Sequence, residues 1–147
     1  DLNSKSIKFD KNNVLDYISN IYSAFELIID RDADYENIDA LSMASDNVWC
    51  AGVILGNPIE NWKNIDFNTL KSTLYWNDET PQEAIIKDAN PFDTLAWVIN
   101  LRLSLNLNIP KGSKIITGSV IKTRSPKKGD VVTYNVGNLS ETKIRLI

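Results

Sequence analysis

The sequence predicts an α+β fold, a β-rich mixed roll or barrel with two principal helices. Short apolar runs bounded by turn residues recur along most of the chain, and these runs predict strands. Apolar residues follow helical spacing in only two stretches, one after Asp10 and one after Asn90. With 147 residues, of which 43% are hydrophobic and 24% charged, the chain is large enough for a core of its own. We therefore expect a single domain, residues 1–147, with mostly antiparallel strands.

The first third of the chain predicts a helix followed by a strand. Asp10 stands where its side chain can cap a helix, and apolar residues recur at helical spacing over residues 14–22. Residues 24–29 form an apolar run with β-branched side chains, which predicts a buried strand. A polar connection over residues 30–39 and a short helical stretch over residues 40–46 follow.

The middle of the chain predicts two more strands and the clearest helix. Residues 48–55 end at a Gly-Asn-Pro turn, and residues 70–76 alternate as in a strand before an Asn-Asp turn. Asn90 and Pro91 suit the cap and the first position of a helix. The apolar residues that follow share one helical face and predict a buried stripe: Phe92, Leu95, Ala96, Ile99 and Leu103.

The last third of the chain predicts three strands. Residues 114–118 end at Thr-Gly-Ser, residues 131–136 follow Lys-Gly-Asp, and residues 142–147 follow a Gly-Asn turn. Lysines and arginines gather only over residues 122–128, a basic turn that either steers an anionic substrate or is a solvated hairpin tip.

The composition argues against several classes of function. The net charge of −3, without a basic face, is unfavourable for nucleic-acid binding, so we expect no nucleic-acid partner. No apolar run is long enough to span a bilayer, so we expect no membrane partner. Cys50 is the one cysteine and forms no intrachain disulfide, which fits the reducing cytoplasm.

The lack of histidine narrows the chemistry that is open to the chain. Any catalysis must then rest on carboxylates, lysines, hydroxyls or a hard cation. Carboxylate sites favour magnesium, manganese or calcium. Glu26 stands out because it interrupts the apolar run over residues 24–29. A buried, unpaired carboxylate costs on the order of several kcal/mol, so Glu26 is expected to meet a metal ion, Arg31 or solvent.

Five blocks of sequence occur in order along the chain, at residues 25–31, 45–56, 90–98, 111–119 and 128–130. The first contains Phe-Glu-Leu-Ile-Ile-Asp-Arg, the third begins Asn-Pro-Phe, and the fourth ends Thr-Gly-Ser. Together they resemble the C-terminal part of the 2-keto-4-pentenoate hydratase family, within the fumarylacetoacetate hydrolase superfamily. The resemblance covers almost the whole chain from about Ile7 onward.

The resemblance implies a fold like the C-terminal domain of fumarylacetoacetase, a divalent cation (Mg²⁺ or Mn²⁺) and a small-molecule 2-oxo acid as substrate. It implies a lyase that hydrates 2-hydroxy-dienoates or 2-oxo acids in aromatic catabolism. In such enzymes three carboxylates hold the cation, which stabilises the charge that develops on the substrate. On this resemblance Glu26 is a metal ligand, and no catalytic residue is assigned. The substrate-binding residues that it implies are Arg31, Asp46, Asn47, Thr117 and Ser119.

Departures from the family pattern predict an incomplete site. The family's Glu-x-Glu pair, which supplies the other two metal ligands, lies upstream of the segment that matches Asp1, as does an active-site lysine. Trp49 stands where the family often has a small hydroxyl residue, and Gly112-Ser113 where Gly-Asp is expected. We therefore expect a C-terminal fragment of a larger hydratase-like protein that binds metal poorly and is inactive as it stands. The surface that such a fragment exposes favours a homo-oligomer.

Each of these residues also has a structural alternative. These alternatives are a local ion pair between Asp30 and Arg31, a helix C-terminal cap or turn at residues 46–47, and a strand end at residues 117–119. For the whole chain, one alternative is a non-catalytic domain of the hydratase fold that serves oligomer assembly or partner binding. Another is an unrelated β-barrel that binds a small molecule.

Overall fold

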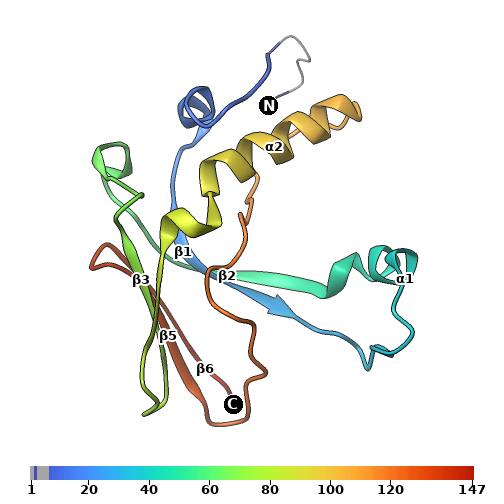
Figure 1. The fold of residues 1–147 in the computed structure, drawn as a ribbon, viewed down its shortest axis with the longest axis vertical. Helices are drawn as coiled ribbons and strands as arrows, with labels where there is room; N and C mark the ends of the chain where they lie inside the picture. Colours follow the sequence, from blue (N-terminus) through green and yellow to red (C-terminus); the bar gives the residue numbers. More distant parts are fainter. Residues whose placement is uncertain (1, 3–6) are drawn as a thin grey trace.

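A computed structural model describes residue 2 and residues 7–147 of the chain. Two antiparallel sheets form its framework (Figure 1). The first pairs β1 (Tyr22–Ile28) with β2 (Cys50–Pro58). The second has the order β4 (Gln82–Ile85), β3 (Lys71–Trp76), β5 (Val131–Val136), β6 (Ser140–Arg145).

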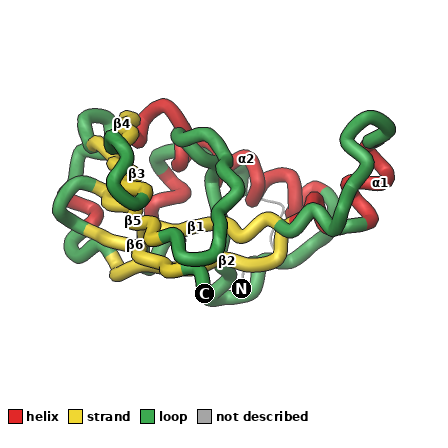
Figure 2. Tube along the Cα trace, turned by 90° about the horizontal axis from the view of Figure 1, so that it is seen from below, coloured by secondary structure: helices red, strands yellow, loops and turns green. Residues whose placement is uncertain are grey.

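The helices lie at two ends of this framework. The long helix α2 (Pro91–Ser104) crosses above the sheets, and the short helix α1 (Ala40–Ser45) sits at the far end of β1 and β2 (Figure 1). Within the described residues, four 3₁₀ turns complete the element order, and they are η1 (Asn13–Tyr17), η2 (Asn47–Trp49), η3 (Trp62–Asn64) and η4 (Ile86–Ala89). Figure 2 shows β1 and β2 as an arm that projects away from the four-stranded sheet toward α1.

Two apolar clusters form the core of the described residues. One packs the buried face of α2 against the N-terminal segment, and its buried members are Phe9, Val14, Ala96, Ile99, Leu103 and Ile109. The other joins the connection after β2 to β5, through Ile59, Trp62, Phe67 and Val136. Phe92, at the start of α2, packs against both clusters and stacks edge-on against Phe67, with ring centroids 5.3 Å apart.

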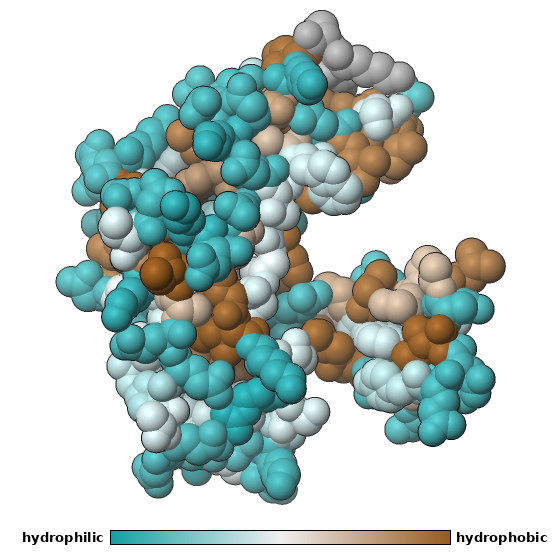
Figure 3. All heavy atoms as spheres, viewed as in Figure 1, coloured by the Kyte–Doolittle hydropathy of each residue, from teal (hydrophilic) through white to brown (hydrophobic). Residues whose placement is uncertain are grey.

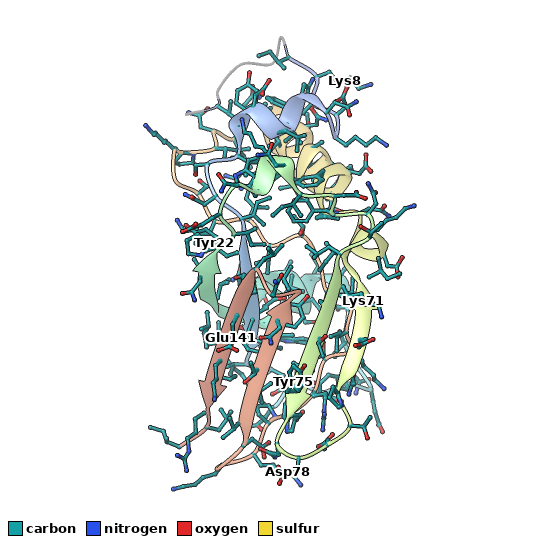
Figure 4. All side chains as sticks on the ribbon, turned by 90° about the vertical axis from the view of Figure 1, so that its left-hand side faces the viewer. Lys8, Tyr22, Lys71, Tyr75, Asp78 and Glu141 are labelled. Carbon is teal, nitrogen blue, oxygen red and sulfur yellow. The ribbon has the colours of Figure 1, made fainter. Side chains whose placement is uncertain are left out.

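Buried hydroxyl groups join the two sheets where β1 passes β6. The Ser23 hydroxyl lies 2.6 Å from that of Thr142 and 2.8 Å from that of Ser140. Ser140 in turn donates to the carbonyl of Asn57 on β2. Gly56 lies against this cluster, where a Cβ would come within 2.4 Å of both the Ser23 and Thr142 hydroxyl oxygens. The opposite face of the four-stranded sheet is exposed, as seen for Lys71, Tyr75 and Glu141 in Figure 4.

The α+β class, the mostly antiparallel strands and the helix after Asn90 are confirmed by the structure. The strands predicted over residues 70–76 and 131–136 form at β3 and β5. Asn90 is the residue before the helix, although its side chain makes no capping hydrogen bond and its φ is 44°. The short helix predicted over residues 40–46 forms as α1, where Asp39 supplies the cap.

Two predicted elements are wrong. The first helix is only the 3₁₀ turn η1, because the Asp10 carboxylate accepts the backbone N–H groups of Asn12 and Asn13 in a tight turn and Ile18 is already extended. Residues 114–118 form no strand. Gly118 has a φ of 99°, which interrupts extended backbone, and no neighbouring strand pairs with this segment among the described residues.

The strand that carries Glu26 is present, but the prediction that it is buried is wrong for its second half. Leu27 and Ile28 at the end of β1 and Ile29 just after it are 38%, 44% and 52% exposed, because they lie in the arm that projects away from the four-stranded sheet. Within residues 2 and 7–147, no helix is long and apolar enough to cross a membrane.

Candidate functional site

A cleft of about 870 Å³ lies between the two sheets, the start of α2 and the connection that follows α2. Its floor is aromatic and aliphatic, with Phe25 from β1, Trp76 from β3 and Tyr134 from β5. Residues 109–124 form one continuous side of it. Figure 3 shows apolar surface gathered in the middle of the molecule, beside the root of the arm. A separate surface hollow near residues 58–64 contains none of the predicted site residues.

Glu26 lies on the edge of this cleft, opposite Val53 of β2. Its side chain is exposed, so the cost of burying a charge does not arise and the expected burial of this carboxylate is wrong. Among the described residues Glu26 forms no hydrogen bond or ion pair, and Arg31 does not reach it. The carboxylate oxygens are therefore available to a ligand from the cleft.

Thr117 and Ser119 line the same cleft, on the irregular connection between α2 and β5. The Ser119 hydroxyl donates to the carbonyl of Ile121 at 2.6 Å and accepts the backbone N–H of Ile121 at 3.2 Å. This local turn holds residues 119–121 in shape. The structure thus brings Glu26, Thr117 and Ser119 to one cleft from segments about 90 residues apart in the sequence.

Arg31, Asp46 and Asn47 lie together at the far end of the arm and do not line the cleft. The alternative to substrate binding for Arg31 was an ion pair with Asp30. Arg31 does form an ion pair, but its partner is Asp46. Asp30 instead accepts a hydrogen bond of 2.5 Å from the Tyr35 hydroxyl. The Asn47 amide donates to the carbonyl of Cys50 at 3.1 Å.

Trp49, the residue that departs from the family pattern, also lies at the end of the arm. Its ring stacks edge-on against Tyr35, with centroids 5.6 Å apart. It does not line the cleft, so it fills no space there. Residues 47–49 have φ values between 49° and 61°, a left-handed run that turns the chain sharply from α1 into β2.

The sequence did not identify Trp76, Glu79 and Arg124 as neighbours of the cleft. The Arg124 guanidinium lies 4.1 Å from the centre of the Trp76 ring and donates twice, at 2.8 Å, to the Glu79 carboxylate. These hydrogen bonds hold the pKa of Glu79 below its ordinary value. Two features of the sequence could have indicated this contact: Trp76 stands just before a predicted turn, and the basic turn lies downstream. Only the antiparallel pairing of β3 with β5, however, brings Trp76 and Arg124 together.

Tyr134 is the other residue of the cleft that the sequence did not single out. Its ring lies 6.0 Å from that of Phe25, so β1 and β5 meet through aromatic side chains at the cleft floor. Burial raises the pKa of Tyr134, while a hydrogen bond with Ser72 acts in the opposite direction. The phenol therefore stays protonated at neutral pH and does not serve as a base.

The described residues do not form a complete metal centre. No group of three or more carboxylate, thiol or imidazole side chains comes together among them. Mg²⁺ and Mn²⁺ take about six oxygen ligands, so the single carboxylate of Glu26 fits as one ligand of such a cation and not as a whole site.

Similarity to curated proteins extends over most of the chain. It is 29% identical over 95% of its length to a 2-oxo-hept-4-ene-1,7-dioate hydratase of Escherichia coli. It is 25% identical over 89% of its length to a 4-oxalocrotonate decarboxylase of Pseudomonas putida. The chain spans about half the length of these relatives, 54% and 53%. No family model matches the sequence.

Solved structures show the same fold. A 4-oxalocrotonate decarboxylase from Pseudomonas putida G7, complexed with magnesium and adipate, matches 94% of the chain with a TM-score of 0.82 and 23% identity. The enzyme complexed with calcium and acetate matches with a TM-score of 0.79 and 24% identity. The chain covers 53% and 52% of these structures. The resemblance drawn from the sequence blocks is therefore confirmed: the chain is similar, along nearly its whole length, to the C-terminal part of the 2-keto-4-pentenoate hydratase family of the fumarylacetoacetate hydrolase superfamily.

Proposed function

We propose that the chain is part of a divalent-metal-dependent lyase that hydrates 2-hydroxy-dienoates or related 2-oxo acids. One observation carries this proposal: Glu26, Thr117 and Ser119 converge on a cleft with an aromatic floor. The Glu26 carboxylate lies on one side of the cleft and the hydroxyls of Thr117 and Ser119 lie on another. This arrangement suits a small substrate that has a polar group at each end. The relatives named as hydratase and decarboxylase support the same reaction class.

The floor of the cleft suits the hydrocarbon part of such a substrate. Phe25, Trp76 and Tyr134 offer flat apolar surfaces, against which a planar conjugated chain packs well. Thr117 is proposed to hold the substrate carboxylate through its hydroxyl, and Ser119 to join it by turning its hydroxyl proton from the Ile121 carbonyl to the substrate. Arg31, Asp46 and Asn47 remain proposed substrate contacts of the arm, away from the cleft.

Glu26 is proposed to be one ligand of a Mg²⁺ or Mn²⁺ ion. Solved relatives complexed with magnesium and calcium support a divalent cation, and the exposed carboxylate at the cleft edge supports the position. A bound cation supplies positive charge to substrate oxygens that become negative during reaction. The remaining ligands would have to come from groups other than the described residues, so we propose that the 147 residues alone bind metal weakly and do not turn over substrate.

Calorimetric titration of Mg²⁺ and of Mn²⁺ into the purified chain, with 2-oxopentanoate present, tests this proposal. We expect a dissociation constant on the order of millimolar or weaker, since one carboxylate displaces little water from a hard cation. Glu26→Gln should abolish the signal, while the matched control Glu60→Gln should leave it unchanged. Equal metal binding by the wild type and Glu26→Gln would exclude Glu26 as the ligand, and micromolar binding would exclude an incomplete site.

A second candidate function is a non-catalytic domain that assembles with copies of itself. The specific observation in its favour is the apolar surface of the arm, where Tyr35 is 63%, Leu41 82% and Val48 55% exposed. Surfaces of this kind are unusual on a monomer and typical of protein interfaces. A homo-oligomer is therefore proposed under either function. A cytoplasmic location is also proposed, which the free thiol of Cys50 fits.

A further inference from the structure

Residues 112–123, the part of the cleft side that carries Thr117 and Ser119, have few described hydrogen bonds to the rest of the protein. We call residues 112–124 the cleft wall, since all of them line the cleft and none lies in a helix or strand. The described hydrogen bonds of residues 112–123 stay within the wall or reach only to Pro110. Among residues 2 and 7–147, no strand pairs with the wall.

Arg124 provides the polar link that the rest of the wall lacks. Its Nη1 and Nη2 atoms each donate to one oxygen of Glu79 at 2.8 Å, a two-point contact that fixes the plane of the guanidinium. The same group lies 4.1 Å from the centre of the Trp76 ring. The Arg124 side chain is 28% exposed, so the contact is half-shielded from water.

The surface that receives Arg124 is itself fixed by hydrogen bonds. Trp76 donates from its indole nitrogen to Asp130 at 3.1 Å, and Asn77 donates to the same carboxylate at 2.8 Å. The Asn77 side-chain oxygen accepts the backbone N–H of Val131 at 2.8 Å. The turn between β3 and β4, which contains Glu79 and is marked by Asp78 in Figure 4, is thus tied to the start of β5.

We propose that Arg124 is a positioning residue for the cleft: by pairing with Glu79 and stacking on Trp76, it holds the cleft wall in the place where Thr117 and Ser119 face a ligand. The inference rests on the proposed function only in naming that ligand as a 2-oxo acid. Releasing Arg124 loosens the wall without unfolding the sheet beneath it, since β3 and β5 keep their backbone pairing.

Hydrogen–deuterium exchange of the whole chain tests the positioning role directly. In Arg124→Gln we expect exchange to accelerate on the order of tenfold at the described hydrogen-bonded amides of the cleft wall, those of Ser113 and Ile121, with peptides from β3 and β5 unchanged. Glu79→Gln should accelerate exchange less, because the stacking on Trp76 remains. Lys128→Gln is the matched control, since Lys128 is exposed, lies outside the wall and is near Arg124 in sequence. It should behave as the wild type.

Charge reversal separates this role from a merely structural one. The double variant Arg124→Glu with Glu79→Arg should recover part of the protection from exchange that the wall loses in Arg124→Gln. The ion pair re-forms in the double variant, but the stacking on Trp76 does not. High salt should accelerate wall exchange in the wild type and leave Arg124→Gln unaffected, since screening weakens a half-exposed pair. Wall exchange in Arg124→Gln equal to that of the wild type, or no recovery in the double variant, would overturn the proposal.

Binding of 2-oxopentanoate in the presence of Mg²⁺ distinguishes failure of this inference from failure of the proposed function. The inference predicts a several-fold weaker dissociation constant for Arg124→Gln than for the wild type and Lys128→Gln. If exchange changes as expected while the wild type binds no 2-oxopentanoate, the wall is positioned by Arg124 and the proposed binding of a 2-oxo acid by these 147 residues fails. If the wild type binds and Arg124→Gln binds equally well, Arg124 does not position the wall for that ligand.

Discussion

The hydroxyl of Ser23 on β1 lies 2.6 Å from the hydroxyl of Thr142 on β6, and both residues are buried. Because Ser140 donates to the carbonyl of Asn57, Ser23 is left to donate to Ser140, and Thr142 to donate to Ser23. The root of the arm is therefore joined to the four-stranded sheet by a directed chain of hydrogen bonds. This junction sets the angle at which the arm, with Glu26, leaves the sheet.

Thr142→Val tests the strength of this junction. The change keeps the volume of the side chain but removes the donor to Ser23, while Ser23 retains its own bond to Ser140. We expect the free energy of unfolding to fall by roughly 0.5–1.5 kcal/mol, the usual net value of one buried hydrogen bond. Urea denaturation measures it. Thr73→Val, on the exposed face of the same sheet, is the control and should cost less; equal losses would refute the hydrogen-bond chain.

Gly56→Ala should be more damaging than its small size suggests. The added Cβ would lie 2.2 Å from the backbone carbonyl oxygen of Glu141, which the β5–β6 ladder holds in place. We expect a loss of roughly 1–3 kcal/mol, typical of overpacking, measured by the same urea denaturation. Gly52→Ala is a matched control on the same strand, because a Cβ there meets no atom within 4 Å. A neutral Gly56→Ala would show that β2 and β6 are not packed this closely.

Acid should weaken the contacts around Trp76. Hydrogen bonds from Arg124 hold the pKa of Glu79 below its ordinary value of 4.5, and the backbone N–H of Lys127 with the Asn77 amide does the same for Asp130, whose ordinary value is 3.8. Because both pKa values are lower in the folded state, their stabilisation is present above these ordinary values and is lost as pH falls below them. The denaturation midpoint, measured at intervals from pH 7 to pH 3, should decrease once the pH is below these ordinary pKa values.

The variant Asp130→Asn supplies the check on this acid dependence. Its midpoint should be lower than that of the wild type at neutral pH, and the two should approach each other as pH falls below 3.8 and through the lowered pKa of the folded state, where the wild-type carboxylate becomes protonated as well. A constant difference between the two proteins across the whole range would show that ionisation of Asp130 does not contribute.

Polar substitutions on the arm should reduce self-association. Ile29 and Leu41 are 52% and 82% exposed, and their apolar surface is available to a second copy of the chain. Sedimentation velocity should show the wild type associating with rising concentration and Ile29→Gln with Leu41→Gln shifted toward the monomer. Tyr75→Gln changes an exposed residue on the opposite side of the four-stranded sheet and should leave association unchanged. A wild type that stays monomeric at every concentration would contradict the proposed oligomer.

Local sequence patterns predicted the elements whose stability is local. The Asn-Pro start and the apolar stripe of α2 specify a helix wherever the chain places it, and the alternation over residues 70–76 specifies a strand. The same patterns failed at residues 114–118, because a strand needs a partner to accept its hydrogen bonds and, in the part of the chain that the structure describes, none lies alongside. They also overestimated the burial of β1, since an apolar run does not record which neighbours cover it.

The sequence by itself determined the fold class, most strands, the long helix and, through the ordered blocks, the resemblance to a hydratase family. Only the tertiary structure decided that Glu26 is exposed, that Thr117 and Ser119 share its cleft, and that Arg31 pairs with Asp46 on the arm instead. It also placed Arg124 over Trp76. The reason is physical: helices and turns follow from interactions a few residues apart, whereas a cleft is formed by packing between segments separated by tens of residues.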